Sequence, residues 1–410
     1  MTEILKFKIG NLEMQGIVGA MGVGNTGPNF INSLYEAGKK EGVPNFLGTL
    51  SAVGGGILKG YFRDALRDSG EERWRIHNLI ANSEGAKKEE WEGVMKELLS
   101  ELYIEADNKS LREDLQAIRG PKALNLMFAT QNYDELARTA VDEGVDLIVT
   151  GAGPALRLPK IISADSDVLL GAIVNGGRTA EKYCKSWGKY GHSPDVIIGE
   201  GPKAGGHDAY TLEQLADPDF VEKGLEKIFR EIVQATKGYS TIRGESIPIL
   251  LAGGAFYGGD MKKILSWEED GIKPLGLQMS TRWLCASDAS DEHKQACIDA
   301  DERSIIKSPV GYPGSAIENE FIRKVREGER HPTGCAYHCL RTCNPDEAPY
   351  CIAKALINTR NGNVDEGVLF AGYNVKHCSN ENFRRNGRFT NSEEVSRDLA
   401  REYRVAAGSS

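Results

Sequence analysis

Short apolar runs alternate with helix-like stretches over most of the chain. Apolar runs of this kind, bounded by glycine, are typical of buried parallel strands, and intervening helical patterns are typical of βαβ units. Eight runs occur, at Leu12–Ala20, Asn45–Ser51, Ala123–Ala129, Asp146–Gly151, Val168–Asn175, Asp195–Gly199, Ile247–Ala252 and Pro274–Ser280. Helical patterns cover Asn29–Lys40, Tyr133–Glu143, Thr179–Tyr190, Thr211–Thr236 and Gly259–Asp270. The pattern predicts an α/β fold, a closed (β/α)8 TIM barrel.

The alternation is interrupted once. A highly charged helical stretch, Glu71–Arg119, lies between the second and third predicted strands. We expect extra helices outside the barrel or, alternatively, a cap over its C-terminal face. After about Gly328 the alternation stops, and a cysteine-bearing segment leads into a polar tail, Asn380–Ser410. We therefore expect a barrel over residues 1–325, with a helical insertion at 60–120, and a C-terminal extension over 326–410.

Composition narrows the class of protein. The 410 residues are 40% hydrophobic and 27% charged, as in a globular protein, and the net charge of -9 argues against a nucleic-acid surface. No apolar run is long enough to cross a membrane, and the first residues do not form a signal segment. We expect a cytoplasmic protein with no membrane partner, whose eight cysteines are mostly reduced thiols.

The most informative segment joins the sixth predicted strand to a glycine-rich turn that ends on a histidine. It reads Asp195-Val-Ile-Ile-Gly-Glu200-Gly-Pro-Lys-Ala-Gly205-Gly206-His207. Glycines let the backbone approach a planar ligand, and histidine transfers protons near neutral pH. His207 is therefore a candidate acid/base residue. The alternative is a surface or helix-capping histidine, since a helical pattern starts near Thr211.

Other strand ends also carry glycine. Gly22-Val-Gly24-Asn-Thr-Gly27 matches a dinucleotide fingerprint, but no acidic residue ends the second predicted strand, as a Rossmann unit requires. The alternatives to a dinucleotide site are a flexible loop or a loop whose amides touch a flavin ring.

The ends of the seventh and eighth strands suit a phosphate site, because barrels often bind phosphate there. The residues concerned are Gly253 and Gly254, with Ser280, Thr281 and Arg282. Ordinary tight turns, with Arg282 paired on the surface, are the alternative.

Two further positions suit a ligand. Asn125 is a polar residue in an apolar strand, so its amide either caps a loop or faces a polar ligand. Gly151-Ala-Gly153-Pro after the fourth strand predicts a turn that opens space beside a ring.

Four cysteines gather in the C-terminal segment. Cys335, Cys339 and Cys343 would share one face of a helix, and Cys351 follows. Four thiolates suit an iron–sulfur cluster or zinc, with His338 as an alternative ligand, but the spacing is not a common form of either site. Thiols that pack in a core or face a substrate are the alternative.

Together these motifs resemble the nitronate monooxygenase family, formerly called 2-nitropropane dioxygenases. The segment from Glu200 to His207 carries the resemblance, with Val149-Thr-Gly-Ala-Gly153, Leu251-Ala-Gly-Gly254 and Gln278-Met-Ser-Thr-Arg282. Lys307-Ser-Pro-Val-Gly-Tyr-Pro-Gly314 is similar to the segment that follows the barrel in this family. The family includes the FMN-dependent enoyl-acyl-carrier-protein reductases of the second type.

The resemblance implies a flavoprotein with non-covalent FMN at the strand C-termini and His207 as its catalytic acid/base. The implied cofactor-binding residues are Ala20, Met21, Gly22, Asn125, Gly151, Glu200, Gly205, Gly206, Gly253, Gly254, Gln278, Ser280 and Thr281. Gly253, Gly254, Ser280 and Thr281 would hold the phosphate of FMN. The insertion and the extension depart from the family pattern, which leaves the substrate open.

Three functions remain open. The first is a monooxygenase that oxidises alkyl nitronates with O2 to a carbonyl compound and nitrite. The second is an FMN-dependent reductase of enoyl thioesters that uses NAD(P)H. The third is a non-catalytic flavin- or phosphate-binding barrel that acts as an interaction protein, with the charged insertion as its contact surface. For either enzyme the expected partners are a small-molecule substrate and O2 or NAD(P)H, and a homodimer is the candidate assembly.

Overall fold

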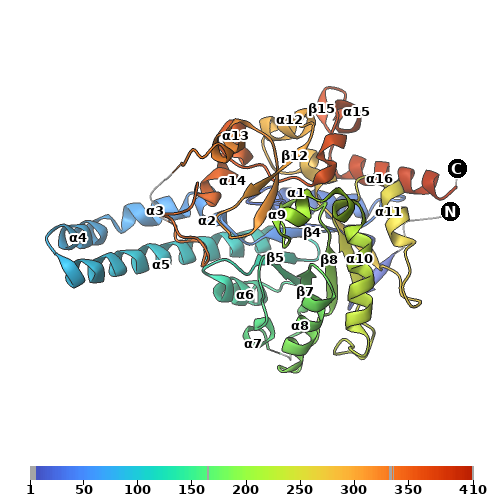
Figure 1. Ribbon diagram of the computed structural model, residues 1–410, viewed down its shortest axis with the longest axis horizontal. Helices are drawn as coiled ribbons and strands as arrows, with labels where there is room; N and C mark the ends of the chain where they lie inside the picture. The colour runs from blue at the N-terminus through green and yellow to red at the C-terminus, as the bar shows by residue number, and fades with distance from the viewer. Residues whose placement is uncertain (1–5, 164–165, 332–334, 336, 409–410) are drawn as a thin grey trace.

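Eight parallel strands close into a barrel in the computed structural model, which describes residues 6–163, 166–331, 335 and 337–408 (Figure 1). The order around the barrel is β10-β11-β3-β4-β5-β6-β7-β8. Their bounds are β3 Gly16–Val18, β4 Phe46–Ser51, β5 Ala123–Met127, β6 Leu147–Gly151, β7 Leu169–Val174, β8 Val196–Glu200, β10 Ile249–Ala252 and β11 Gly276–Met279. The predicted TIM barrel is confirmed. Because the sheet is closed, the Rossmann interpretation of the Gly22 loop is excluded.

The first predicted strand divides in two. β1 (Phe7–Ile9) and β2 (Leu12–Met14) form an antiparallel hairpin, and β3 begins only at Gly16. Gly10, with a φ of +56°, makes the turn. Phe7 and Ile9 pack into the same apolar cluster as Ile17 and the inward-facing residues of the other strands. The hairpin thus closes the N-terminal end of the barrel. The chain start at residues 1–5, used in the prediction about a signal segment, lies outside the described residues.

Helices follow the strands on the outside of the barrel. They are α1 Pro28–Gly38, α6 Tyr133–Asp142, α7 Leu158–Ile161, α8 Gly177–Gly188, α9 Leu212–Ala216, α10 Pro218–Thr236 and α11 Gly258–Leu265. The pattern over Thr211–Thr236 predicts one helix, but two form. Pro218 cannot donate a backbone hydrogen bond and so starts a new helix, which Asp217 caps through the N–H of Asp219. None of the described helices is both long and apolar enough to span a membrane.

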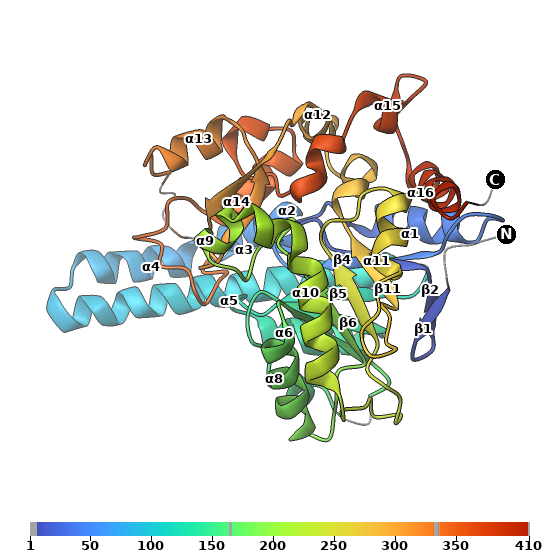
Figure 2. The ribbon, with the colours of Figure 1, turned by 45° about the vertical axis from the view of Figure 1, so that its right-hand side comes forward.

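The insertion after β4 forms a helical arm. It consists of α2 Gly55–Leu58, α3 Tyr61–Asp68, α4 Gly70–Ala81 and α5 Gly85–Ala117. α4 and the first half of α5 run side by side away from the barrel (Figures 1 and 2). The second half of α5 is anchored, because the buried carboxylate of Asp107 accepts hydrogen bonds from the N–H of Gly56 and the amide of Asn132. The arm therefore joins the barrel beside the ends of β4 and β5.

The eighth helix of the outer ring comes from the end of the chain. β11 is followed by the short 3-10 helix η1 (Thr281–Ala286), and α16 (Ser392–Ala406) packs against α11 and α1 (Figure 2). Asn391 caps α16 in a reciprocal pair with Glu394, and Val395 and Leu399 are buried. The segment from Asn380, whose polar composition predicts a tail, is thus an ordered part of the barrel. Its last two residues lie outside the described ones.

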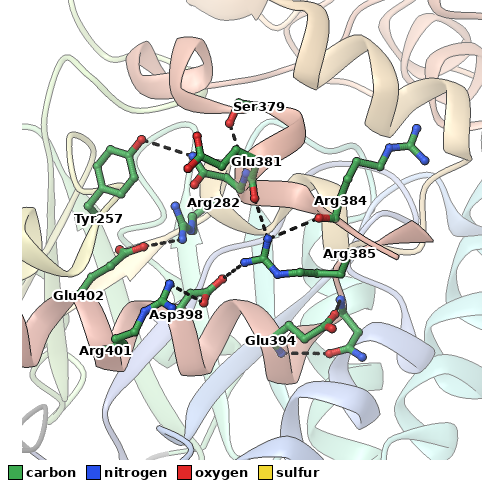
Figure 3. Close-up of polar contacts among 12 residues, drawn as sticks. Tyr257, Arg282, Ser379, Glu381, Arg384, Arg385, Glu394, Asp398, Arg401 and Glu402 are labelled. Carbon is green, nitrogen blue, oxygen red and sulfur yellow. Dashed lines mark hydrogen bonds and ion pairs between the residues drawn. The ribbon is translucent and has the colours of Figure 1, made fainter. Parts of the chain in front are cut away.

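A buried ion pair fixes α16 to the barrel. The guanidinium of Arg282, only 1% exposed, donates from Nη2 to Oε1 of Glu402 at 2.9 Å (Figure 3). The other carboxylate oxygen of Glu402 accepts the N–H of Gly258 at the start of α11. The rings of Phe256, Tyr257 and Phe383 surround the guanidinium. Arg282, considered above as a phosphate donor or a surface residue, is therefore a buried residue that holds α16.

The rest of the C-terminal half covers one end of the barrel. Its elements are α12 Asp291–Asp299, β12 Arg303–Lys307, β13 Pro313–Ile317, α13 Glu320–Arg326, α14 Ile352–Arg360, η2 Val364–Glu366, η3 Tyr373–His377, α15 Asn380–Phe383, β14 Arg384–Arg385 and β15 Arg388–Phe389. β13 pairs with β12 and with β9 (Gly206–His207), the short strand after β8. This three-stranded sheet attaches the extension to the segment that carries His207, at the C-terminal ends of the barrel strands.

Candidate active site

A cavity of about 200 Å³ lies at the C-terminal ends of the barrel strands. Residues from the C-terminal parts of five strands face it: Ser51, Asn125, Gly151, Glu200 and Gln278. The extension and the β12–β13 loop before it supply the opposite wall, which is mostly apolar. That wall includes Val310, Leu340, Ile352, Leu356 and Phe370. The cavity therefore lies between barrel and extension, where active sites of this fold occur.

Most of the residues predicted for the cofactor meet in this cavity. Those that line it are Ala20, Met21, Gly22, Asn125, Gly151, Glu200, Gly205, Gly206, Gln278, Ser280 and Thr281, together with His207. Gly253 and Gly254 do not line it. They follow β10 with φ values of +88° and +104°, and they pack against Lys203 and Ala204 of the loop after β8. The cofactor roles of all these residues stay predictions.

The glycines predicted to approach a planar ligand differ in their surroundings. Gly22 and Gly206 have φ values of +99° and +92°, and a Cβ built on either would meet no atom within 4 Å. Gly205 is tightly packed, because a Cβ there would come within 2.6 Å of the carbonyl carbon of Ala371. Gly22 and Gly206 thus leave space beside the backbone, whereas Gly205 lets the extension approach.

His207 is held at the wall of the cavity by the β12–β13 loop and by the extension. Its Nε2 lies 2.8 Å from Oγ of Ser308, and its ring packs edge-on against Phe370 with centroids 4.8 Å apart. Burial lowers the pKa of His207 to about 4. The imidazole is therefore neutral near pH 7, which is the form that accepts a proton. Ser308 lies in the motif Lys307–Gly314, but sequence reasoning gave it no role.

Two carboxylic acids lie beside His207 with raised pKa values. Burial raises the pKa of Glu200, which lines the cavity, to about 7. Burial and the nearby charge of Glu200 raise the pKa of Asp208 to about 8, against the opposing effect of Arg303. Sequence reasoning did not select Asp208, although it directly follows His207. Near pH 7 this part of the site thus carries less negative charge than its sequence indicates.

The buried carboxyl group of Asp208 should make the folding stability of the protein depend on pH. Its side chain is 1% exposed, and neither carboxylate oxygen has a hydrogen-bond partner within the described part of the chain. A raised pKa means that the folded state binds the proton more tightly, so stability is lost as pH rises from the unfolded pKa towards the folded one. We expect Asp208→Asn to gain stability relative to the wild type by up to about 3 kcal/mol between pH 5 and pH 7.5 in urea unfolding. A difference that does not change with pH would contradict this prediction.

The region predicted to bind phosphate is crossed by the extension. The hydroxyl of Thr281 accepts the N–H of Gly372 at 3.0 Å, and the side-chain amide of Asn374 donates to the carbonyl of Gly254 at 2.7 Å. The hydroxyl of Ser280 donates to the carbonyl of Gly19 at 3.3 Å. Phe370, Gly372 and Asn374 carry no motif that would have marked them in the sequence. Their place above the strand ends depends on the fold of the extension.

Two side-chain amides that face the cavity have polar atoms with no partner among the described residues, so these atoms are available to a ligand. Oε1 of Gln278 is buried with no hydrogen-bond partner among the described residues, and the side-chain amide of Asn125 likewise makes no hydrogen bond there. An amide offers both a donor and an acceptor, as a heterocyclic ring with alternating carbonyls and N–H groups requires. The ring of a flavin fits this set of groups and the open space beside Gly22 and Gly206.

The cysteine segment is not the helix that would place its thiols on one face. Cys335 and residues 337–351 form turns and isolated bridges, and the structure has all eight cysteines as thiols. No group of three or more His, Cys, Asp or Glu side chains in the described ranges is arranged to hold a metal ion. Residues 332–334 and 336 lie outside those ranges.

Comparisons with known proteins agree with this architecture. A family model for nitronate monooxygenase matches residues 98–382, more than half of the chain. FabK from Thermotoga maritima is 16% identical, over 96% of this chain and 93% of its own, with a TM-score of 0.59. A nitroalkane oxidase from Streptomyces ansochromogenes is 16% identical, over 96% of both chains, with a TM-score of 0.60. No curated protein matches by sequence.

Proposed function

This chain belongs to the nitronate monooxygenase family and is an oxidoreductase, and from that premise we propose that it is an FMN-dependent enzyme that oxidises alkyl nitronates with O2 to a carbonyl compound and nitrite. The observation that carries the proposal is the neutral His207 on the wall of a cavity at the strand ends, among groups that fit a flavin ring. FMN, when bound, would supply the electron-accepting and oxygen-reactive chemistry.

The residues of the chain have separate tasks in this proposal. Asn125 and Gln278 would orient the flavin ring through their side-chain amides, and Gly22 and Gly206 would allow its close approach. His207 would orient the nitronate or, when the neutral nitroalkane enters the site, take the α-carbon proton that converts it into the nitronate, because its imidazole is neutral near pH 7. Ser308 would fix the orientation of the imidazole through its contact with Nε2. The apolar wall supplied by the extension would exclude water.

The cavity lining also indicates the substrate class. Among the described residues that line it there is no lysine or arginine, and the wall of the extension is aliphatic and aromatic. A second anionic group on the substrate would have no cationic partner here. We therefore propose alkyl nitronates with an apolar chain in preference to propionate nitronate.

The same apolar wall favours a second candidate, the reduction of an enoyl thioester with NAD(P)H. An acyl chain would lie against Leu340, Ile352 and Phe370 as readily as an alkyl nitronate would. The two candidates differ in their co-substrates, because one consumes O2 and the other consumes NAD(P)H.

Assays of the purified protein separate these functions. We expect a yellow protein with FMN near one per chain, and O2 uptake with butyl nitronate that is faster than with propionate nitronate. NADPH oxidation that depends on crotonyl thioester, without nitronate-dependent O2 uptake, would identify the reductase instead. A colourless protein that does not take up FMN would contradict both.

A further inference from the structure

A short stretch of the extension, residues 371–374, crosses the ends of three barrel strands, and we call it the strap. It is hydrogen-bonded to the loops after β8, β10 and β11. The bonds run from the N–H of Tyr373 to the carbonyl of Lys203 at 3.1 Å, from the side-chain amide of Asn374 to the carbonyl of Gly254, and from the N–H of Gly372 to the hydroxyl of Thr281. The strap therefore joins the loops on which the phosphate site is predicted.

The strap lies against these loops without a gap. A Cβ built on Gly372 would be 2.8 Å from the carbonyl oxygen of Lys203 and 2.9 Å from Oγ1 of Thr281. The φ of Gly372 is -81°, which any residue adopts, so close approach alone requires glycine here. On its other side the strap is bonded to β13, because Ala371 and Ser315 exchange two hydrogen bonds. Ala371 also lines the cavity at the strand ends, so the strap begins at the edge of that cavity.

Hydrogen-bond donors of the loops remain unused beside the strap. The backbone N–H groups of Gly254 and Ala255 make no hydrogen bond among the described residues. The oxygen of the Thr281 hydroxyl accepts the N–H of Gly372, so the hydroxyl proton is left to donate elsewhere. Free backbone N–H groups after these two strands are the donors that bind phosphate in barrels.

Positive charge gathers around the ring of Tyr373 in the strap. The cationic groups of Lys376, Lys203 and Arg303 lie 4.4, 5.1 and 5.3 Å from its centroid. Lys203 is paired with Glu222 at 2.6 Å, whereas Lys376 makes no ion pair in the described part of the chain. Because like charges repel one another, such a group favours an anionic ligand.

We propose that the strap closes the phosphate end of the flavin site and restricts this site to flavins that end in a single phosphate. The phosphate would accept hydrogen bonds from the free donors of Gly254, Ala255 and Thr281, with the lysines as counter-charges. The adenylate of FAD continues beyond this point, so the strap would have to leave its three loops to make room. A clash built against the wrong ligand gives specificity. The inference rests on the flavin of the proposed function and not on the oxidation of nitronates.

The test is the affinity of the full-length protein, freed of flavin, for FMN, riboflavin and FAD in isothermal titration calorimetry. We expect FMN to bind at least about tenfold more tightly than riboflavin, which lacks the phosphate, and at least about tenfold more tightly than FAD. Equal affinity for FMN and FAD, or for FMN and riboflavin, would overturn this inference alone. Binding of none of the three would overturn the proposed function as well.

Gly372→Ala tests the strap itself, because the added methyl group displaces it from Lys203 and Thr281. We expect the ratio of FMN affinity to FAD affinity to fall at least about fivefold, as for the loss of one or more hydrogen bonds. Gly188→Ala in α8 is the matched control, since a Cβ there meets no atom within 4 Å, and it should keep the ratio. Circular dichroism and the melting temperature show whether each variant is folded.

Asn374→Ala is a second strap variant, which removes only the hydrogen bond to Gly254. It should lower the same ratio at least about twofold. Asn358→Ala is its control, because that amide donates to the carbonyl of Glu366 elsewhere in the extension. An unchanged ratio in the folded strap variants would show that the strap does not select the cofactor.

Lys376→Gln tests the charge beside the strap. We expect it to weaken FMN binding about threefold and to leave riboflavin binding unchanged, since only FMN carries the phosphate. Lys354→Gln, at an exposed lysine of α14, should affect neither ligand. If Lys376→Gln weakened the binding of FMN and riboflavin equally, the positive group would not act on a phosphate, and the proposed phosphate end would be wrong.

Discussion

Replacing His207 with alanine is expected to lower kcat/KM by a factor of about 100 or more while FMN stays bound. General acid–base groups contribute about 10²- to 10⁴-fold to rate, and His207 is the imidazole on the cavity wall. Its ring also packs on Phe370, so the variant loses some packing as well as the base. Steady-state kinetics, with flavin content measured on the same samples, check this prediction.

The pH profile distinguishes a base from a packing residue. Because burial lowers the pKa of His207 to about 4, the base is neutral through pH 5 to 8, and its contribution to activity should be lost only as pH drops through about 4. That acidic limb should be absent in the alanine variant. Burial raises the pKa of Glu200 to about 7, so this residue titrates between pH 5 and pH 8. Its effect on activity in that range should be the same in the wild type and in the alanine variant.

Ser308→Ala is the matched control for His207. It removes the hydroxyl that contacts Nε2 but keeps the imidazole, so we expect a loss of about tenfold, as for a positioning residue. Full activity of the His207→Ala variant with bound FMN would remove this residue from the mechanism. Loss of FMN from that variant would instead show that His207 acts in binding.

Glu402→Gln is expected to lower the free energy of unfolding by about 3 kcal/mol or more, because it leaves a buried cation without its counter-charge. The partner is Arg282, whose Nε and Nη1 have no hydrogen-bond partner within the described ranges, so Glu402 provides its compensating charge (Figure 3). Urea unfolding followed by tryptophan fluorescence measures the change.

A second glutamate on α16 provides the control. Glu393 pairs with Lys40 and Arg397 at the surface, where such pairs contribute about 1 kcal/mol or less. Glu393→Gln should therefore have little effect. Replacing both Arg282 and Glu402 with apolar residues of similar size should recover much of the loss, since no charge is then left buried. If Glu402→Gln were as mild as Glu393→Gln, α16 would not depend on the buried pair.

The cavity at the strand ends was predictable only in part. Asn125, Glu200, His207 and Gln278 lie at or just after strand ends, so the barrel alone brings them together. The sequence does not indicate that Ser308 would contact His207, or that Gly372 would bond to Thr281. Ser308 comes from the β12–β13 loop and Gly372 from the extension, and their approach depends on long-range packing that no local pattern specifies.

The sequence by itself determined the barrel and the identity of its chemical groups. Each predicted strand run overlaps a barrel strand, because burial on both faces of a parallel sheet requires continuous apolar residues. Sequence also marked His207 and the four C-terminal cysteines. Only the tertiary structure decided that α16 closes the ring of helices and that the strap crosses the strand ends. It also decided that His207 is neutral and Asp208 protonated near pH 7. Local sequence patterns predict which residues are buried and where turns form, whereas pKa values and ligand sites depend on which distant segments of the chain pack together.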